Sequence, residues 1–147
     1  MKVKITIGFL SVLVVALFVL LGVQQQLPIY VHKEVKKSTF WVAHTFDAIM
    51  NLTNTRAFFL SNFQLIAEEN NSQSFHEMLS NIERLLDDNI SQTNNIKKIR
   101  ALLSDPNDDN KVQIYIIINE MISMEAMLFK ARIETLEEIN NLLNSRG

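Results

Sequence analysis

The 147-residue sequence predicts an all-α protein, in which one N-terminal transmembrane helix is followed by an elongated antiparallel bundle of three long helices. Three observations predict this class. An uncharged apolar run opens the chain, apolar residues then recur at helical spacing, and no alternation of apolar and polar residues indicates a strand. Glycine occurs only at positions 8, 22 and 147, so turns should be few.

The first element is the apolar run of nineteen residues at positions 5–23, which contains no charged side chain. A helix of this length spans about 28 Å, close to the hydrocarbon thickness of a bilayer. A cleaved secretory signal is the alternative, because Lys2 and Lys4 precede the run. The run is longer than a usual signal core and ends without a small-x-small cleavage site, which favours an uncleaved anchor over residues 1–27.

Orientation follows from the lysines on either side of the run. Lys2 and Lys4 adjoin it, whereas the next lysines begin about ten residues beyond its end and are offset by Glu34. This favours a cytoplasmic amino terminus. We therefore expect a single-pass protein of the bacterial inner (cytoplasmic) membrane, with the bulk of the chain in the periplasm.

Residues 28–37 form a basic juxtamembrane segment that suits anionic lipid head groups, so the lipid bilayer is the first predicted partner. Aromatic rings near the exit would lie at the head-group level. Alternatively, the lysines only solubilise the exit, and the tryptophan belongs to the bundle core. The residues expected at the membrane interface are Tyr30, Lys33, Lys36, Lys37 and Trp41.

Charge and composition exclude several function classes for the remaining chain. Residues 1–37 carry a net charge of +4, while residues 38–147 hold nine basic and fifteen acidic groups, a net of −6. An acidic domain disfavours nucleic acid as a partner. The chain has no cysteine, its three histidines are not spaced i, i+4, and it has neither a phosphate-binding loop nor a nucleophile motif. We expect no catalytic site, no metal site and no cofactor.

The bundle domain, residues 38–147, is interrupted at two polar stretches, 69–72 and 104–110. Ser74 and Glu77 read as a capping box, and Pro28 is expected to end or kink the span helix. The three predicted helices cover residues 38–69, 74–104 and 110–145, and short connections make neighbours antiparallel. Because three helices leave the bundle incomplete, we expect a homodimer or a partner membrane or envelope protein to complete it.

Heptad spacing predicts which residues face the bundle axis. The predicted seam of the first helix is Val42, Phe46, Ile49, Thr53, Arg56, Leu60, Phe63 and Ala67. The second seam is Phe75, Leu79, Ile82, Leu86, Asn89, Thr93, Ile96, Arg100 and Leu103. The third is Ile114, Ile118, Met121, Glu125, Leu128, Arg132, Thr135, Ile139 and Leu142.

Polar residues near the middle of each seam would meet in one layer if the helices are antiparallel. Arg56 and Glu125 would then avoid two unpaired buried charges, and Arg56 could hold a small anionic solute through its planar fork. Alternatively, the layer only fixes register, or the helices rotate by one position and expose these groups. The candidate ligand-binding residues are Thr53, Arg56, Asn89, Thr93 and Glu125.

The MKVK start, the single span and long helical stretches such as NLTNTRAFFL at 51–60 and LEEINNLLNS at 136–145 carry a family resemblance. The chain resembles the periplasmic four-helix-bundle sensor regions of methyl-accepting chemotaxis receptors and sensor histidine kinases. It departs from them because no second span or transmitter follows, so any signal must pass to a partner. The resemblance implies a sensory or accessory module, and the alternative is a helical spacer or assembly factor of a cell-envelope complex without a ligand.

Overall fold

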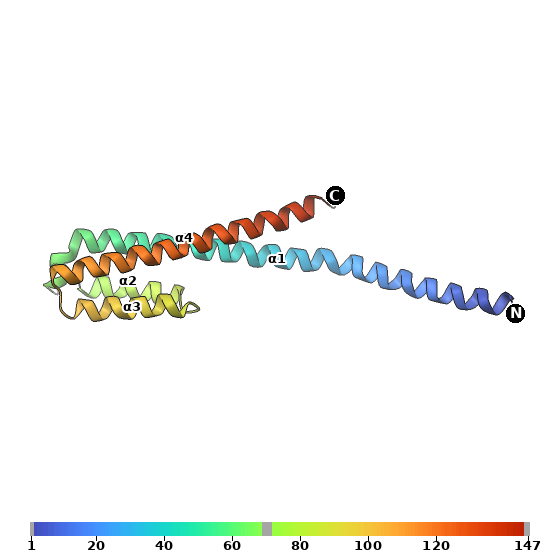
Figure 1. Cartoon of the computed structure of the whole chain (residues 1–147), viewed down its shortest axis with the longest axis horizontal. Coiled ribbons are helices and arrows are strands. Elements are labelled where there is room, and N and C mark those ends of the chain that lie inside the picture. Colours follow the sequence, from blue (N-terminus) through green and yellow to red (C-terminus); the bar gives the residue numbers. More distant parts are fainter. Residues whose placement is uncertain (1, 69–71, 146–147) are drawn as a thin grey trace. The chain divides into compact units, whose positions relative to one another are not determined.

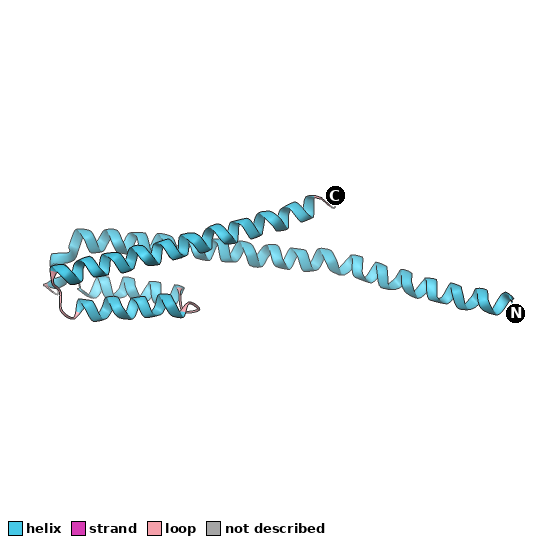
Figure 2. Ribbon diagram, viewed as in Figure 1, coloured by secondary structure: helices cyan, strands magenta, loops and turns pink. Residues whose placement is uncertain are grey.

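The computed structural model describes the backbone of residues 2–68 and 72–145 and the side chains of residues 29–68 and 72–145 (Figure 1). These ranges hold four helices: α1 at Lys2–Ala67, α2 at Ser72–Leu85, α3 at Ile90–Leu103 and α4 at Asp108–Asn144. Figure 2 shows loops between the helices and no strand in the described ranges. The predicted all-α class is therefore confirmed.

The chain divides into two compact units. Unit 1 contains residues 1–39 and 136–147, and unit 2 contains residues 40–135. Unit 2 thus comprises the later part of α1, the whole of α2 and α3, and most of α4. These four helical segments share one apolar core.

Contacts within unit 2 show how its helices pair. Phe46 on α1 lies with its ring centre 6.2 Å from that of Phe129 on α4, and further along α1 Phe63 lies 4.9 Å from Lys111 Nζ. Residues later in α1 therefore contact residues earlier in α4, which is the arrangement of an antiparallel helix pair. The short helices are joined by the ion pair between Arg100 Nη2 and Glu83 Oε2, 2.9 Å apart.

Large apolar side chains fill the core of unit 2. Phe59 from α1 and Phe75 from α2 are fully buried, and their ring centres lie 5.3 Å apart. Each such side chain contributes about 1.5–3 kcal/mol through removal from water. The core consists of Ala48, Leu52, Phe59, Phe63, Ile66, Phe75, Leu79, Ile82, Leu86, Ile96, Ile99, Ile114, Ile118 and Met121.

The expectation of three outer helices is wrong, because the segment predicted as one helix over residues 74–104 forms α2 and α3. The break falls at Asp87, Asp88 and Asn89, whose short polar side chains compete for backbone hydrogen bonds and favour caps and turns. The fourth helical segment of unit 2 therefore comes from the chain itself. Ser74 is not the cap either, since α2 already begins at Ser72.

Two predictions about α1 also require correction. This helix continues for 66 residues through Pro28, so the expected end of the span helix is not there. Proline removes one backbone donor, and the bonds of the neighbouring turns maintain a long helix around it. The predicted seam is shifted by one position over most of its length, as the rotation alternative allowed. The buried residues of α1 are Thr45, Ala48, Leu52, Thr55, Phe59, Phe63 and Ile66.

Agreement is closer in the other helices. The first four residues of the predicted third seam, Ile114, Ile118, Met121 and Glu125, are the buried residues of α4. The later part of that seam is wrong, since Leu128, Thr135 and Leu142 are exposed. In α2, the predicted residues Phe75, Leu79 and Ile82 are buried as well. After the break the register changes, and α3 buries Gln92, Ile96 and Ile99.

One helix among the described residues, α4, is long and apolar enough to cross a membrane by length and composition. This helix is C-terminal, whereas the expected anchor at residues 5–23 was N-terminal. The anchor run lies in α1, but its side chains fall outside the described residues. The middle of α4 also belongs to the core of unit 2, where Ile114 and Met121 are fully buried.

Candidate functional site

Arg56, the residue predicted to hold an anion, lies half-buried on α1 and contacts α4. Its Nη1 donates a hydrogen bond to Asn119 Oδ1 at 2.7 Å. Asn119 Nδ2 in turn donates to the carbonyl oxygen of Tyr115 at 3.0 Å. The partner of Arg56 is therefore a neutral amide rather than Glu125, and the contact joins the outer sides of α1 and α4.

Glu125 is buried in the core with 2% of its surface exposed, and its partner comes from α3. Gln92 Nε2 donates to Glu125 Oε1 at 2.9 Å and to the carbonyl oxygen of Met121 at 3.2 Å. Gln92 is itself fully buried, and its Oε1 has no hydrogen-bond partner in the structure. The pair places a carboxylate in an apolar interior beside a neutral donor, an environment that is costly for a charge.

Asn89 and Thr93 bond to the backbone of α3. Asn89 is the N-cap residue, and its Oδ1 accepts a hydrogen bond from the backbone N–H of Gln92 at 3.2 Å. Thr93 Oγ1 donates to the carbonyl oxygen of Ile90 at 3.0 Å. Thr53 lies half-buried on α1. Asn89 and Glu125 both accept from Gln92, one from its backbone and one from its side chain, while Arg56 bonds to Asn119 and Thr93 to Ile90. These contacts do not link the predicted residues to one another in a single polar layer. Solute binding by these residues stays a prediction.

A polar and aromatic cluster that the sequence did not predict joins α1 to α4 near one end of unit 2. The guanidinium carbon of Arg132 lies 4.8 Å from the Trp41 ring centre, and Arg132 Nη1 donates to the Trp41 carbonyl oxygen at 3.3 Å and to Thr45 Oγ1. Thr45 is fully buried and donates to the same carbonyl at 2.6 Å. The heptad pattern placed Arg132 on a seam but could not name its partner.

The predicted membrane-interface residues divide between the two units. Tyr30 is 63% exposed in unit 1, where Lys33, Lys36 and Lys37 are exposed too. Trp41 belongs to unit 2 and is half-buried beneath Arg132. In unit 2 it contacts Arg132 of α4, and it is not one of the buried core residues.

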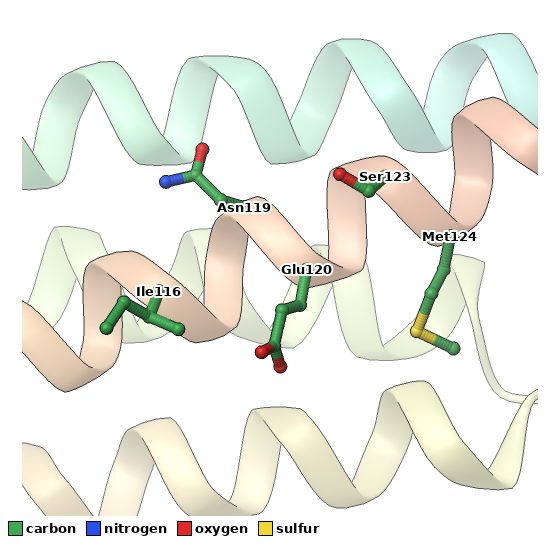
Figure 3. A pocket seen from close by; sticks show the side chains of 5 residues that line it. All are labelled: Ile116, Asn119, Glu120, Ser123 and Met124. Carbon is green, nitrogen blue, oxygen red and sulfur yellow. The ribbon is translucent and has the colours of Figure 1, made fainter.

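Two hollows among the described residues of unit 2 are open depressions of the surface. One of about 480 Å³ runs along α4 and is lined by residues of that helix alone. In Figure 3, Asn119 points toward α1 while Glu120 and Met124 point to the opposite side of α4. Another, of about 350 Å³, is lined by His44, Asn81, Arg84 and Leu85. Among the described residues, no cluster of three or more histidine or acidic side chains could hold a metal ion.

Comparison with protein-family models, curated proteins and solved structures finds no match to this chain. Its helices and their contacts therefore carry the functional argument. The described part offers buried polar links between helices, open surface depressions and exposed apolar side chains on α1 and α4.

Proposed function

We propose that the chain is a single-pass protein of the bacterial inner membrane, anchored by residues 5–23, whose periplasmic helical unit works through contacts with other proteins. The observation that carries this proposal is the continuity of α1, which runs for 66 residues from Lys2 to Ala67. One helix thus includes both the uncharged apolar run and the part of unit 2 that contains Leu52 and Phe59. A displacement of this helix in unit 2 would be passed along its axis.

The apolar run of α1 suits a bilayer better than α4 does. Residues 5–23 contain no charge, whereas α4 carries Glu120, Glu125, Lys130 and Arg132 in its middle. A lysine, arginine or aspartate at the centre of a spanning helix costs about 2.5–3.5 kcal/mol on insertion scales. Moving α4 into a membrane would also remove Ile114, Ile118 and Met121 from the core of unit 2. The cost of inserting the charges of α4 and the loss of its core contacts both favour α1 as the anchor.

Partner contacts are a better supported mode of action than solute binding. Both hollows are open to solvent: the one along α4 presents Glu120 and no basic side chain, and the other presents Arg84 without enclosing a solute. In contrast, large apolar side chains are exposed on two helices of the same unit, and exposed apolar surface is typical of protein-binding faces. Those on α1 and α4 within unit 2 are Phe40, Phe46, Met50, Leu60, Leu65, Val112, Tyr115, Ile116, Met127 and Leu128.

Two forms of this function remain distinct. In a sensory or accessory module, a partner or solute biases the packing of α1 against α4, and the anchor responds. In a structural spacer or assembly factor, the unit holds a partner at a fixed place and its packing does not change. The filled core of unit 2, with Phe59, Phe75 and Ile118 almost fully buried, favours the second form when no partner is bound.

Membrane retention of the full chain tests the anchor. We expect the chain to remain in the membrane pellet after alkaline carbonate extraction, with its Met-Lys-Val-Lys start retained in the intact mass. A variant with Leu13→Arg and Val14→Arg should be released, because each charge opposes insertion by about 2.5–3.5 kcal/mol. Met127→Arg places a charge on an exposed position of α4 and should remain in the pellet.

The two candidate spans give opposite results in this experiment. Release by the charge at residue 127 but not by those at residues 13 and 14 would assign the span to α4. A mass lacking the first twenty or so residues would show a cleaved signal. Orientation follows from alkaline phosphatase fused after residue 135, which is active only outside the cytoplasm, and inactivity there would reverse the predicted topology.

A further inference from the structure

The side of α1 that faces away from the core of unit 2 carries a second apolar stripe. Its members alternate in steps of three and four along the helix, the spacing of two helices packed along a shared seam. Met50 is 44% exposed and Leu60 49%, and Phe46 is 51% exposed although one side of its ring lies near Phe129 of α4. We call this set the α1 outer stripe; it consists of Ala43, Phe46, Met50, Thr53, Ala57 and Leu60.

Charge on and around the stripe suits pairing with an identical surface. Its six residues carry no charge, although charged residues make up 20% of the chain. A parallel twofold pair brings each stripe residue against its own copy, so any charge there would be opposed by the same charge. Among the flanking residues, Arg56 is held toward α4 by Asn119, and the exposed polar rim residues are Asp47, Asn54 and Ser61, of which only Asp47 is charged.

We infer that the α1 outer stripe pairs with the same stripe of a second copy in a parallel homodimer. This rests on the proposed anchor, because two chains held by the same terminal span stand in the same orientation. The exposed rings of Phe46 and the side chains of Met50 and Leu60 would then meet their own copies across the seam. Each chain would bury apolar groups that unit 2 leaves in water.

The length of the stripe determines where the dimer forms. Residues 43–60 make about two and a half heptads, whereas a lasting coiled coil needs at least about three to four. The stripe is too short to hold two free chains together firmly. Confinement of two chains in one membrane raises the effective concentration of the second helix, and this makes pairing through a short stripe favourable.

The alternating steps of three and four residues that define the stripe can be continued toward the N-terminus into the anchor. Steps of three and four backwards from Ala43 pass Lys36, which would face the same charge on the second copy and add nothing, and then reach Gly22 and Gly8. Small residues are the positions at which helices approach most closely in bilayers. Two of the three glycines of the chain therefore fall on the same heptad count as the outer stripe, and a left-handed supercoil of the pair would keep this count on one face.

Because the chain has no cysteine, single cysteines can locate the interface directly. Met50→Cys and Ala57→Cys, each in the full chain in its membrane, should give disulfide-linked dimers on mild oxidation. Ala101→Cys is the matched control, since it makes the same exchange at an exposed helical position of α3. We expect little or no dimer from the control, because it lies on another helix.

A charge placed in the stripe should abolish the linkage. Leu60→Lys, introduced into the Met50→Cys chain, opposes two like charges and should lower the cross-linked fraction by about tenfold or more. Leu65→Lys is the control for this change, because Leu65 is 42% exposed on the same helix but lies outside the stripe.

Each remaining outcome contradicts a specific part of the inference. Membrane-bound chains that give no dimer, or as much dimer from Ala101→Cys, would overturn the pairing and leave the anchor intact. A linked product of another mass would assign the stripe to a different protein. Chains released from the membrane would refute the anchor and, with it, the parallel pairing that rests on the anchor, whereas membrane-bound chains without the dimer refute the pairing alone.

Discussion

The guanidinium carbon of Arg132 lies 4.8 Å from the centre of the Trp41 ring, and the Arg132 Nη1 donates to the carbonyl oxygen of the same tryptophan. The contact joins α4 to α1 within unit 2. The groups that receive the cation here are a ring face, a carbonyl and the Thr45 hydroxyl, none of which is negatively charged. The link is therefore a packed, directional contact between two long helices.

Removing the cation should weaken this link measurably. Arg132→Met keeps an apolar stem but loses the ring contact and the donated hydrogen bonds, and we expect the free energy of unfolding to fall by about 1–3 kcal/mol. Urea unfolding of the full chain in detergent measures the change. Lys130→Met, whose side chain is 80% exposed, should cost less than about 0.5 kcal/mol. Equal losses in the two variants would contradict a special role for Arg132.

Removing only Gln92 should lower the free energy of unfolding more than removing Gln92 and Glu125 together. Gln92→Leu leaves the carboxylate in the core without its donor, so we expect a loss of about 2–4 kcal/mol. Adding Glu125→Leu removes the stranded group and should restore most of that stability or exceed the native value. Urea unfolding of four proteins, the native chain, Gln92→Leu, Glu125→Leu and the double variant, gives the coupling energy. Strictly additive losses would show that the hydrogen bond at 2.9 Å contributes little.

Asn89 should act through the helix it caps. Asn89→Ala removes the acceptor of the Gln92 amide, and a lost N-cap costs about 0.5–2 kcal/mol. Asn94→Ala, at an exposed position inside α3, should be neutral or slightly stabilising because alanine is the better helix former. Thermal unfolding followed by circular dichroism distinguishes them. A loss with the Asn94 variant as large as that with Asn89→Ala would exclude capping as the cause.

Phe75 should be the main contact between α2 and α1. Phe75→Ala opens a cavity beside Phe59, and we expect a loss of about 3–5 kcal/mol, a large fraction of the stability of a small domain. Ile90→Ala is the control, because Ile90 is 76% exposed, and it should stay within about 0.5 kcal/mol of the native chain. Near-ultraviolet circular dichroism should lose its aromatic signal only in the Phe75 variant.

The seam of α1 shows why apolar spacing alone could not define the core. Phe46 and Leu60 recur at heptad spacing on one side of this helix, and Leu52 and Phe59 do so on another. Both sets satisfy the pattern, and only the packing of α2 and α4 against Leu52 and Phe59 decides which set is buried. The helical class needs no such tertiary information, and the sequence predicted it correctly.

The polar contacts were harder to anticipate than the helices. Counting heptads onward through Asp87 and Asp88 placed Ile96 correctly but named Thr93 and Arg100 where the structure buries Gln92 and Ile99. The sequence did place Glu125 on the correct seam of α4. The partner of Glu125 depends on where α3 begins, and the Asn89 cap sets that start. The prediction followed the apolar spacing and did not use this local capping signal.

The difference in helix length inside unit 2 implies that its stability is uneven. Helices α2 and α3 have 14 residues each, while the parts of α1 and α4 within this unit, 40–67 and 108–135, are each twice as long. On α4 the buried residues end at Glu125, so the stretch that holds Arg132 is shielded by less of the core. Backbone amides there should exchange with deuterated water through local opening, well before those around Phe59 and Ile118. The end of unit 2 at Trp41 would then rearrange without unfolding the remainder.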